Sequence, residues 1–120
     1  MSRAHRLRAV RAGRWAEALC VWMLRLKGYR VLARDLRTPV GEVDIVARRR
    51  RVLAVVEVKA RATMDEAATA LGAKQRQRIA RAAGYLQATL PAARDADIRF
   101  DVMLVVPWRL PVHIINAWGH

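Results

Sequence analysis

Three charged residues fall within a strongly apolar stretch of the chain, residues 41–60. Asp44 lies in the segment Gly-Glu-Val-Asp-Ile-Val, and Glu57 and Lys59 lie in the segment Val-Val-Glu-Val-Lys-Ala. Charged side chains are seldom buried unless they are paired or bind a metal. Two carboxylates and a lysine in this setting indicate a chemical site. The alternative is a buried structural ion network, which has to overcome the cost of desolvation.

The same stretch predicts two strands joined by a tight turn. Alternation along a strand places Asp44 on one face with Glu42, and Glu57 on one face with Lys59. A two-residue turn that pairs Arg48 with Arg51 would bring these two faces together, whereas a turn one residue longer would separate them. The turn is all arginine and lacks the Asn-Gly or Asp-Gly chemistry that tight hairpins favour.

Neighbouring carboxylates repel each other, which raises the pKa of at least one of them. A divalent cation removes this penalty, and Mg²⁺ prefers carboxylate and phosphate oxygens as ligands. A metal held by Asp44 and Glu57 would activate water and offset negative charge at a phosphorus centre. Lys59 would position the water or neutralise the developing charge. These residues therefore predict Mg²⁺- or Mn²⁺-dependent cleavage of a phosphodiester.

The charge of the chain indicates a polyanionic partner. There are 23 basic and 10 acidic residues, a net charge of +13, and 20 of the basic residues are arginine. Guanidinium groups bind phosphate in bidentate fashion, and such excess charge attracts nucleic acid of any sequence. DNA is the expected partner, although charge alone does not distinguish it from RNA. The expected phosphate contacts, whose alternative is solvated surface charge, are Arg48, Arg49, Arg50, Arg51, Arg61, Lys74, Arg78 and Arg81.

Length and composition limit the organisation of the chain. The 120 residues predict a basic N-terminal arm over residues 1–12 and a single domain over residues 13–120. The single cysteine, Cys20, cannot form an intrachain disulfide, which favours a cytoplasmic location. The first apolar run, residues 18–24, is too short for a membrane span and is bounded by charges.

The periodicity predicts the order helix, three strands, helix, and one or two strands. The helices are expected at residues 13–27 and 74–89. Outside the hairpin, strands are expected at residues 29–36, 98–106 and 112–118, whereas residues 63–73 suggest a loop with a helical turn. One face of the first helix carries an apolar stripe at helical spacing, Trp15, Leu19, Trp22, Met23 and Leu26. The four tryptophans, Trp15, Trp22, Trp108 and Trp118, are expected to be packing anchors, with base-stacking platforms as the alternative, and Trp108 is the one expected to be exposed.

Several motifs in order resemble a known group of proteins. They are Gly-Arg-Trp-Ala-Glu-Ala-Leu, Lys-Gly-Tyr-Arg-Val-Leu, Gly-Glu-Val-Asp-Ile-Val, Val-Glu-Val-Lys-Ala-Arg, Lys-Gln-Arg-Gln-Arg-Ile-Ala-Arg-Ala-Ala-Gly-Tyr-Leu and Arg-Phe-Asp-Val-Met-Leu-Val. The chain from about residue 13 to residue 118 resembles the YraN-like family, which is related to Holliday junction resolvases of the PD-(D/E)xK nuclease superfamily. The resemblance implies an α/β fold with a restriction-endonuclease-like or resolvase-like core, in which two long helices flank a mixed sheet of about five strands.

The resemblance also implies roles for single residues. Asp44 and Glu57 match the metal-binding acids of the superfamily, and Lys59 matches its lysine. Glu17 matches a glutamate that resolvase-like members direct at the metal, although an ion pair with Arg14 is the alternative. Four further residues have expected roles. Gln75 is either a site residue or a helix-end hydrogen bonder, and Glu42 lies in a family motif without an assigned role. Asp101 is expected to form a structural ion pair, and Cys20 is expected to be a core residue.

Two functions of different classes follow from these observations. The first is a metal-dependent endonuclease that acts on branched or structured DNA, because the chain offers arginines for backbone contacts but no base-reading element. The second is a non-catalytic nucleic-acid-binding module with a vestigial site. An RNA- or ribosome-associated protein is a third, weaker reading. By analogy with resolvases, a homodimer is expected.

Overall fold

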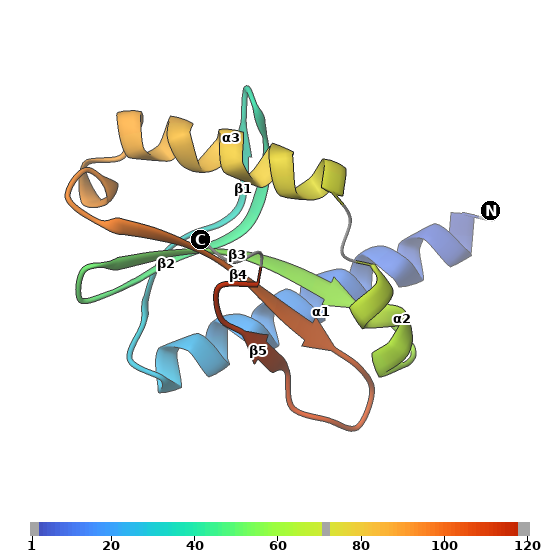
Figure 1. Ribbon diagram of the computed structural model, residues 1–120. Coiled ribbons are helices and arrows are strands. Elements are labelled where there is room, and N and C mark those ends of the chain that lie inside the picture. The colour runs from blue at the N-terminus through green and yellow to red at the C-terminus, as the bar shows by residue number, and fades with distance from the viewer. Residues whose placement is uncertain (1–2, 71–72, 118–120) are drawn as a thin grey trace.

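The computed structural model describes the backbone of residues 3–70 and 73–117, and the side chains of residues 13–70, 77 and 80–117. The fold is mixed α/β, with a single five-stranded sheet and helices on both of its faces (Figure 1). The strands are β1 (Arg30–Thr38), β2 (Gly41–Arg49), β3 (Val52–Ala60), β4 (Asp97–Val105) and β5 (Val112–Ile114). The helices are α1 (Arg3–Leu26), α2 (Met64–Thr69), α3 (Ala73–Thr89) and a 3-10 turn, η1 (Pro91–Ala93).

The sheet has the strand order β1-β2-β3-β4-β5, and only β3 and β4 run parallel to each other. A parallel pair needs a long crossover connection, which α2 and α3 provide. This arrangement confirms the expected mixed α/β fold and is compatible with a resolvase-like core. None of the described helices is long and apolar enough to cross a membrane.

The predicted order of elements is confirmed, but two boundaries were wrong. Helix α1 begins at Arg3 and not at Gly13, so the expected arm contains helical residues. Strand β5 ends at Ile114, four residues before the predicted end at residue 118, which lies outside the described residues. The region of uncertain assignment contains α2, which starts where the Thr63 hydroxyl accepts a hydrogen bond from the Glu66 N–H. The division into an arm and a domain stays a prediction.

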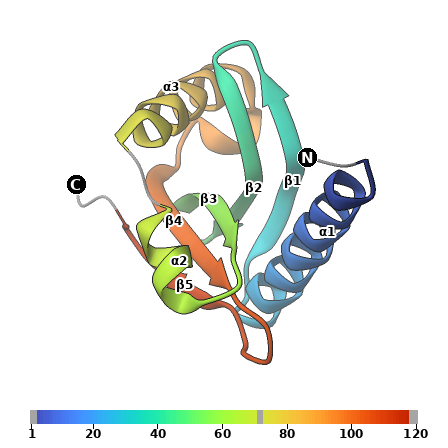
Figure 2. The ribbon, with the colours of Figure 1, turned by 90° about the vertical axis from the view of Figure 1, so that its right-hand side faces the viewer.

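Helix α1 covers one face of the sheet, and α2 and α3 cover the other (Figure 2). Beneath α1, the residues Ala16, Cys20 and Leu24 pack on Ile45 and Ala47 of β2. Beneath α3, the apolar cluster contains residues of β2 and β3 together with three helix residues, namely Val43, Val46, Leu53, Val55, Ala82, Ala83 and Leu86. A third cluster joins α2 to β4 through Ala67, Val102, Leu104 and Val106.

The tryptophan stripe of α1 does not form the core, contrary to the prediction. The buried side of α1 consists of Ala16, Cys20, Val21 and Leu24, whereas Trp15 is 62% exposed and Trp22 is 55% exposed. Small side chains let the helix approach the sheet closely, and this leaves the bulky indoles on the outer side of the helix. The exposure expected for Trp108 is confirmed, because its side chain is fully exposed.

The turn between β2 and β3 consists of Arg50 and Arg51, and the pair that closes it is Arg49 with Val52. The predicted pairing of Arg48 with Arg51 was therefore wrong by one position in each strand. The predicted register would have placed Asp44 opposite Val55, whereas the observed register, continued past the pair Ile45–Val56, places Asp44 opposite Glu57. Arg50 adopts a left-handed backbone with φ = +56°, which tight hairpins require and which glycine or asparagine usually supplies.

Strands β1 and β2 bend where Asp35 lies opposite Asp44, between the pairs Arg34–Ile45 and Leu36–Val43. Asp35 has a left-handed backbone with φ = +47°. Across the bend, Val43 and Val46 both join the cluster beneath α3 although they are three positions apart, so strict alternation does not hold here and the facing of Asp44 stays a prediction. The two strands curve away from the rest of the sheet, and their turn rises beside α3 (Figures 1 and 2).

Candidate active site

Asp44 lies where the hydrogen-bonded ladder between β2 and β3 stops. The last paired residues are Ile45 and Val56. Beyond them, the Val58 N–H donates a hydrogen bond of 2.8 Å to Oδ2 of Asp44, so a side chain takes the place of a backbone partner. Because Val58 stands between Glu57 and Lys59 in sequence, this bond brings the Asp44 carboxylate to the backbone that carries both residues.

Glu57 and Lys59 form a buried ion pair on β3. Nζ of Lys59 lies 3.0 Å from Oε1 of Glu57, and the two residues are 7% and 6% exposed, respectively. Their neighbours on β4 are Val102 and Leu104, which belong to the cluster beneath α2. The pair thus projects from the face that α2 and α3 cover, and its charges have to compensate each other because little water reaches them.

Glu17 approaches Asp44 from the other side, on α1. Nε of Arg34 donates a 3.3 Å hydrogen bond to Oε1 of Glu17, so the partner is Arg34 of β1, where Arg14 was the alternative. Burial raises the pKa of Glu17 above its ordinary value; the bond from Arg34 opposes this rise, and the charges of Asp44 and Asp35 add to it. The carboxylates of Glu17 and Asp44 are also close enough to act on the buried thiol of Cys20.

The pKa of the Cys20 thiol is affected by the same negative charges. Burial raises the pKa of the Cys20 thiol to about 12, and the charges of Asp44 and Glu17 contribute to the rise. A thiol that does not ionise at neutral pH is a poor nucleophile. Cys20 is therefore a core residue, as expected.

Glu17, Asp44, Glu57 and Lys59, which we call the bend cluster, offer the donors that a hard divalent cation prefers. Carboxylate oxygens suit Mg²⁺ and Mn²⁺. Burial is the main cause of the raised pKa of Glu17, and a cation would offset this cost together with the smaller repulsion from Asp44 and Asp35. Among the residues whose side chains are described, no three histidine, cysteine or acidic groups converge closely enough to hold an ion on their own. The donor set fits Mg²⁺ chemically, with part of the coordination left to water and substrate phosphate.

Asp101 lies apart from the bend cluster, in a network of its own beneath α1. Nε and Nη2 of Arg99 each donate a 2.8 Å hydrogen bond to its two oxygens, Nε2 of His113 lies 2.8 Å from Oδ2, and the Asn116 N–H donates to Oδ1 at 3.0 Å. Arg99 also donates to the hydroxyl of Tyr29. The expected structural ion pair is confirmed, and we call these five residues the Asp101 network.

The network keeps Asp101 ionised although the residue is fully buried. Burial opposes ionisation, but the hydrogen bonds from His113 and Arg99 outweigh it and lower the pKa of Asp101 to about 2. Glu42 is also separate from the bend cluster, because its side chain is exposed and lies 3.8 Å from Nε of Arg37. Neither acid contributes to the candidate site.

Two of the four hairpin arginines take part in packing. Arg48 donates hydrogen bonds to the carbonyl of Ala92 and to Asp95, and the guanidinium of Arg49 lies 4.5 Å from the ring centre of Tyr29. Arg50 and Arg51 are exposed. They lie six or more residues from Glu57 along the strand, which is about 20 Å in an extended chain.

The other expected phosphate contacts lie elsewhere. Arg61 follows the end of β3, two residues after Lys59, and Arg81 lies on α3; both are exposed. The side chains of Lys74, Gln75 and Arg78 lie outside the described residues, so their predicted roles stay predictions.

Sequence reasoning missed Arg34 and Asp35. Both act on Glu17, the first by an ion pair and the second by its charge. The signal was an Arg-Asp pair inside the apolar segment Val-Leu-Ala-Arg-Asp-Leu, since adjacent opposite charges within a strand have to project to different sides or interrupt the strand. The left-handed backbone of Asp35 shows that the strand is interrupted.

The chain is similar in sequence to a known protein family over most of its length. Residues 16–105 match the uncharacterised protein family UPF0102. A UPF0102 protein of Parvibaculum lavamentivorans is 56% identical over 93% of this chain and 84% of its own length. A second, from Paramagnetospirillum magneticum, is 51% identical over 98% of this chain and 93% of its own length. The chain belongs to the UPF0102 family, which confirms the YraN-like resemblance of its motifs.

Proposed function

We propose that the protein is a metal-dependent endonuclease that hydrolyses phosphodiester bonds of branched or structured DNA. The observation that carries the proposal is the position of the Asp44 carboxylate, 2.8 Å from the backbone nitrogen between Glu57 and Lys59. Asp44 approaches the backbone of Glu57 and Lys59 where the ladder stops and the sheet bends, and Glu17 lies within electrostatic range of Asp44 on the α1 side. A structural role alone does not require so many like charges in a partly buried place.

In this proposal, Asp44 and Glu57, assisted by Glu17, hold Mg²⁺ or Mn²⁺. When bound, the metal supplies positive charge against the phosphate and activates water. Lys59 is held beside Glu57 at 3.0 Å and orients the attacking water or offsets the charge that develops on the phosphate. The low exposure of Glu57 and Lys59 strengthens these interactions, because little water screens them.

The charge of the chain supports nucleic acid as the substrate. A net charge of +13 favours association with a polyanion, and exposed arginines such as Arg61 and Arg81 are free of the packing that holds Arg48. Contacts to the backbone position a nucleic acid but do not read its sequence, which fits recognition of shape. A cytoplasmic location and a homodimer belong to the same proposal.

A non-catalytic nucleic-acid-binding module is the second candidate. It is favoured by the Glu57–Lys59 pair and by the bond from Val58 to Asp44, since both give the acids partners without a metal. This module would bind nucleic acid in a salt-sensitive manner, with no dependence on the metal.

Metal binding to the purified chain separates the two candidates. Titration calorimetry with Mg²⁺ and with Mn²⁺, in low salt and with a short branched DNA present, would be compared with cleavage of flap and four-way junction substrates. We expect metal uptake in the native chain and its loss in the double variant Asp44→Asn/Glu57→Gln. We expect Lys59→Met to reduce the cleavage rate about 10²- to 10⁴-fold, the usual range for a group that assists proton transfer.

Glu66→Gln is the matched control, because it removes one exposed carboxylate on α2 outside the bend cluster. Its metal uptake and cleavage should equal those of the native chain. Equal metal uptake in the double variant and the native chain would contradict the proposed site. DNA binding without cleavage of any substrate, and unchanged by the three substitutions, would leave the binding module as the function.

A further inference from the structure

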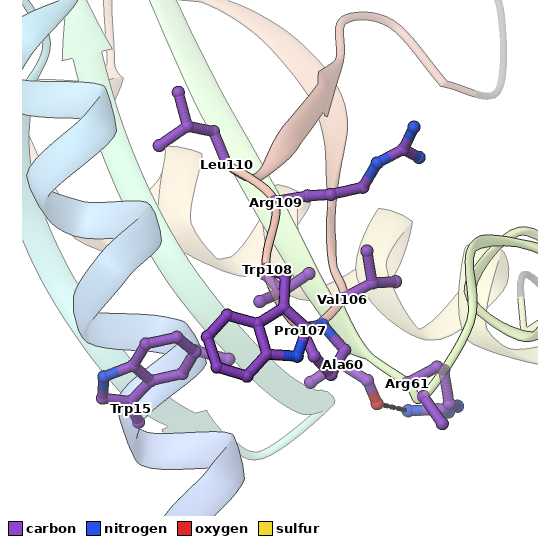
Figure 3. Close-up of a pocket in the computed structure, with 11 residues that line it drawn as sticks. Trp15, Ala60, Arg61, Val106, Pro107, Trp108, Arg109 and Leu110 are labelled. Atoms are coloured by element: carbon purple, nitrogen blue, oxygen red, sulfur yellow. Dashed lines mark hydrogen bonds between the residues drawn. The ribbon is translucent and has the colours of Figure 1, made fainter.

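A groove of about 870 Å³ lies between α1 and the loop that joins β4 to β5. Trp15 borders it from the helix and Trp108 from the loop, while Ala60 and Arg61 line it at the end of β3 (Figure 3). We call it the Trp15–Trp108 groove. Trp22 lies on the same helix but is not one of its lining residues.

Trp108 is presented to solvent by a stiff loop. The side chain is fully exposed, and the loop places a proline at residue 107 and another at residue 111. Proline fixes its own φ, which limits the conformations of a short loop. Trp108 itself has a left-handed backbone with φ = +67°, which is strained for a bulky residue and is kept only where the surroundings demand it. The backbone that carries the indole is thus constrained, while the indole itself is exposed.

The charge of the groove favours one kind of occupant. Two arginines line it, Arg61 and Arg109, and no aspartate or glutamate is among its described lining residues. A second copy of this chain would bring its own excess of arginine against this surface, at a cost in repulsion. A polyanion with flat apolar rings would instead match both the arginines and the indoles.

The groove begins one residue away from the bend cluster on two elements. Ala60 directly follows Lys59 on β3, and Ala16, which also lines the groove, directly precedes Glu17 on α1. Because successive strand residues project to opposite faces, the groove lies with Glu17 on the α1 side of the sheet, and a nucleic acid strand in it would pass the end of β3 to reach Lys59 and Glu57.

We propose that the Trp15–Trp108 groove binds unpaired bases of the nucleic acid, which stack on the two indoles while their phosphates contact Arg61 and Arg109. This inference rests on the proposed nucleic acid ligand and names the part of it that is recognised. Every base has a flat face, so stacking on aromatic side chains needs no particular sequence. In a duplex the faces are covered by neighbouring bases, so the groove selects single-stranded tails, flaps or open junctions.

Fluorescence anisotropy with labelled oligonucleotides tests the inference without any metal. A single-stranded oligonucleotide and a blunt duplex of equal length would be titrated in low-salt buffer with a chelator. Trp108→Gly removes one indole and relieves the left-handed strain, and Trp15→Ala removes the other at an exposed helix position. Each should weaken single-strand binding about tenfold, the effect of losing one stacked base, and leave duplex binding unchanged.

Trp22→Ala is the control, since it removes a half-exposed indole from α1 outside the groove and should change neither affinity. Native single-strand affinity in both groove variants would overturn the inference, and so would an equal loss for single strand and duplex. A native dimer that Trp108→Gly converts to monomers in sedimentation would show that the groove is an interface between copies. Base-dependent binding without any cleavage would defeat only the nuclease proposal, whereas a failure to bind any nucleic acid would defeat both.

Discussion

Glu57 and Asp101 lie on adjacent parallel strands, and the residue paired with Asp101 is Val56, directly before Glu57. The two acids are therefore close in the sheet but project from opposite faces. Asp101 is surrounded by Arg99, His113 and the backbone N–H of Asn116. Glu57 belongs to the bend cluster, in which Lys59 pairs with Glu57 and Arg34 pairs with Glu17.

The difference lies in how the negative charge is compensated. In the Asp101 network, one carboxylate receives donors at both oxygens, and its pKa falls to about 2. In the bend cluster, burial and neighbouring acids raise the pKa of Glu17. A buried carboxyl group with a lowered pKa is typical of a structural ion pair, whereas a raised pKa is typical of a site that binds a cation or a proton.

Asp101→Asn should have the largest effect on stability, because it leaves Arg99 buried against a neutral group. Removing one partner of a buried pair costs about 3–5 kcal/mol. Asp44→Asn should cost less than about 1.5 kcal/mol, since the asparagine oxygen still accepts the Val58 N–H and the repulsion with Glu17 disappears. Urea unfolding at neutral pH measures both free energies.

The contrast between these two variants tests the assignment of the two regions. If Asp44→Asn destabilises the fold as much as Asp101→Asn, the bend cluster is a structural network and the comparison fails. If both variants lower the free energy of unfolding only slightly, Asp101 does not stabilise the fold as its four hydrogen bonds indicate. Asp95→Asn is a control for the loss of a carboxylate at the surface, where Asp95 pairs with Arg48.

Acid should weaken the Asp101 network at an unusually low pH. A carboxyl group whose folded pKa is lowered stabilises the fold above its ordinary pKa, and this contribution is lost as the pH falls through the folded value. For Asp101 the loss runs from about pH 4 to about pH 2, and a shift of nearly two units corresponds to about 2–3 kcal/mol. The free energy of unfolding, followed from pH 5 to pH 2, measures it.

The Asp101→Asn variant tests whether Asp101 is the group that causes the loss of stability in acid. It lacks the titrating carboxyl group, so its stability should fall less than that of the native chain over the same interval, and the difference between the two proteins should narrow towards pH 2. A constant difference across this range would mean that Asp101 does not have a lowered pKa.

Much of the fold could be predicted because its signals are local. Apolar runs of strand length, two long helical periods and the positions of glycine and proline are enough to give the order of the elements. The ion pair of Glu57 with Lys59 also follows from local spacing, since residues i and i+2 share a strand face.

The features that could not be predicted depend on tertiary packing. The spacing of Trp15 and Trp22 is equally compatible with a core stripe and an exposed one, and the small residues Ala16 and Cys20 decided which side faces the sheet. The facing of Asp44 depends on a bend at Asp35, which lies on another strand and interrupts the alternation. Arg99 lies two residues before Asp101 on β4, so this pair has the same local spacing as Glu57 and Lys59. The other partners, His113 on β5 and the backbone N–H of Asn116, are 12 and 15 residues away in sequence, and no local pattern predicts them.

Glu17→Gln should change the free energy of unfolding least, and it should raise this free energy where Asp101→Asn lowers it. A carboxyl group whose folded pKa is raised destabilises the fold when it is ionised, and this penalty disappears as the pH falls through the folded pKa towards the ordinary value of 4.5. Glutamine keeps the acceptor for Arg34 but carries no charge. At neutral pH we expect the free energy of unfolding to rise by less than about 1 kcal/mol, because partial exposure screens the repulsion.

The pH dependence of this small gain distinguishes it from an ordinary change in packing. The gain should be present at pH 7 and absent near pH 4, where Glu17 of the native chain is protonated as well, whereas a packing effect would persist at both values. Divalent metal should reverse the order of stability, because a cation bound by the bend cluster stabilises the native chain and finds fewer ligands in the variant. If Glu17→Gln is less stable than the native chain at pH 7 without metal, the carboxylates at the bend are compensated as well as Asp101 is, and the difference between the two regions disappears.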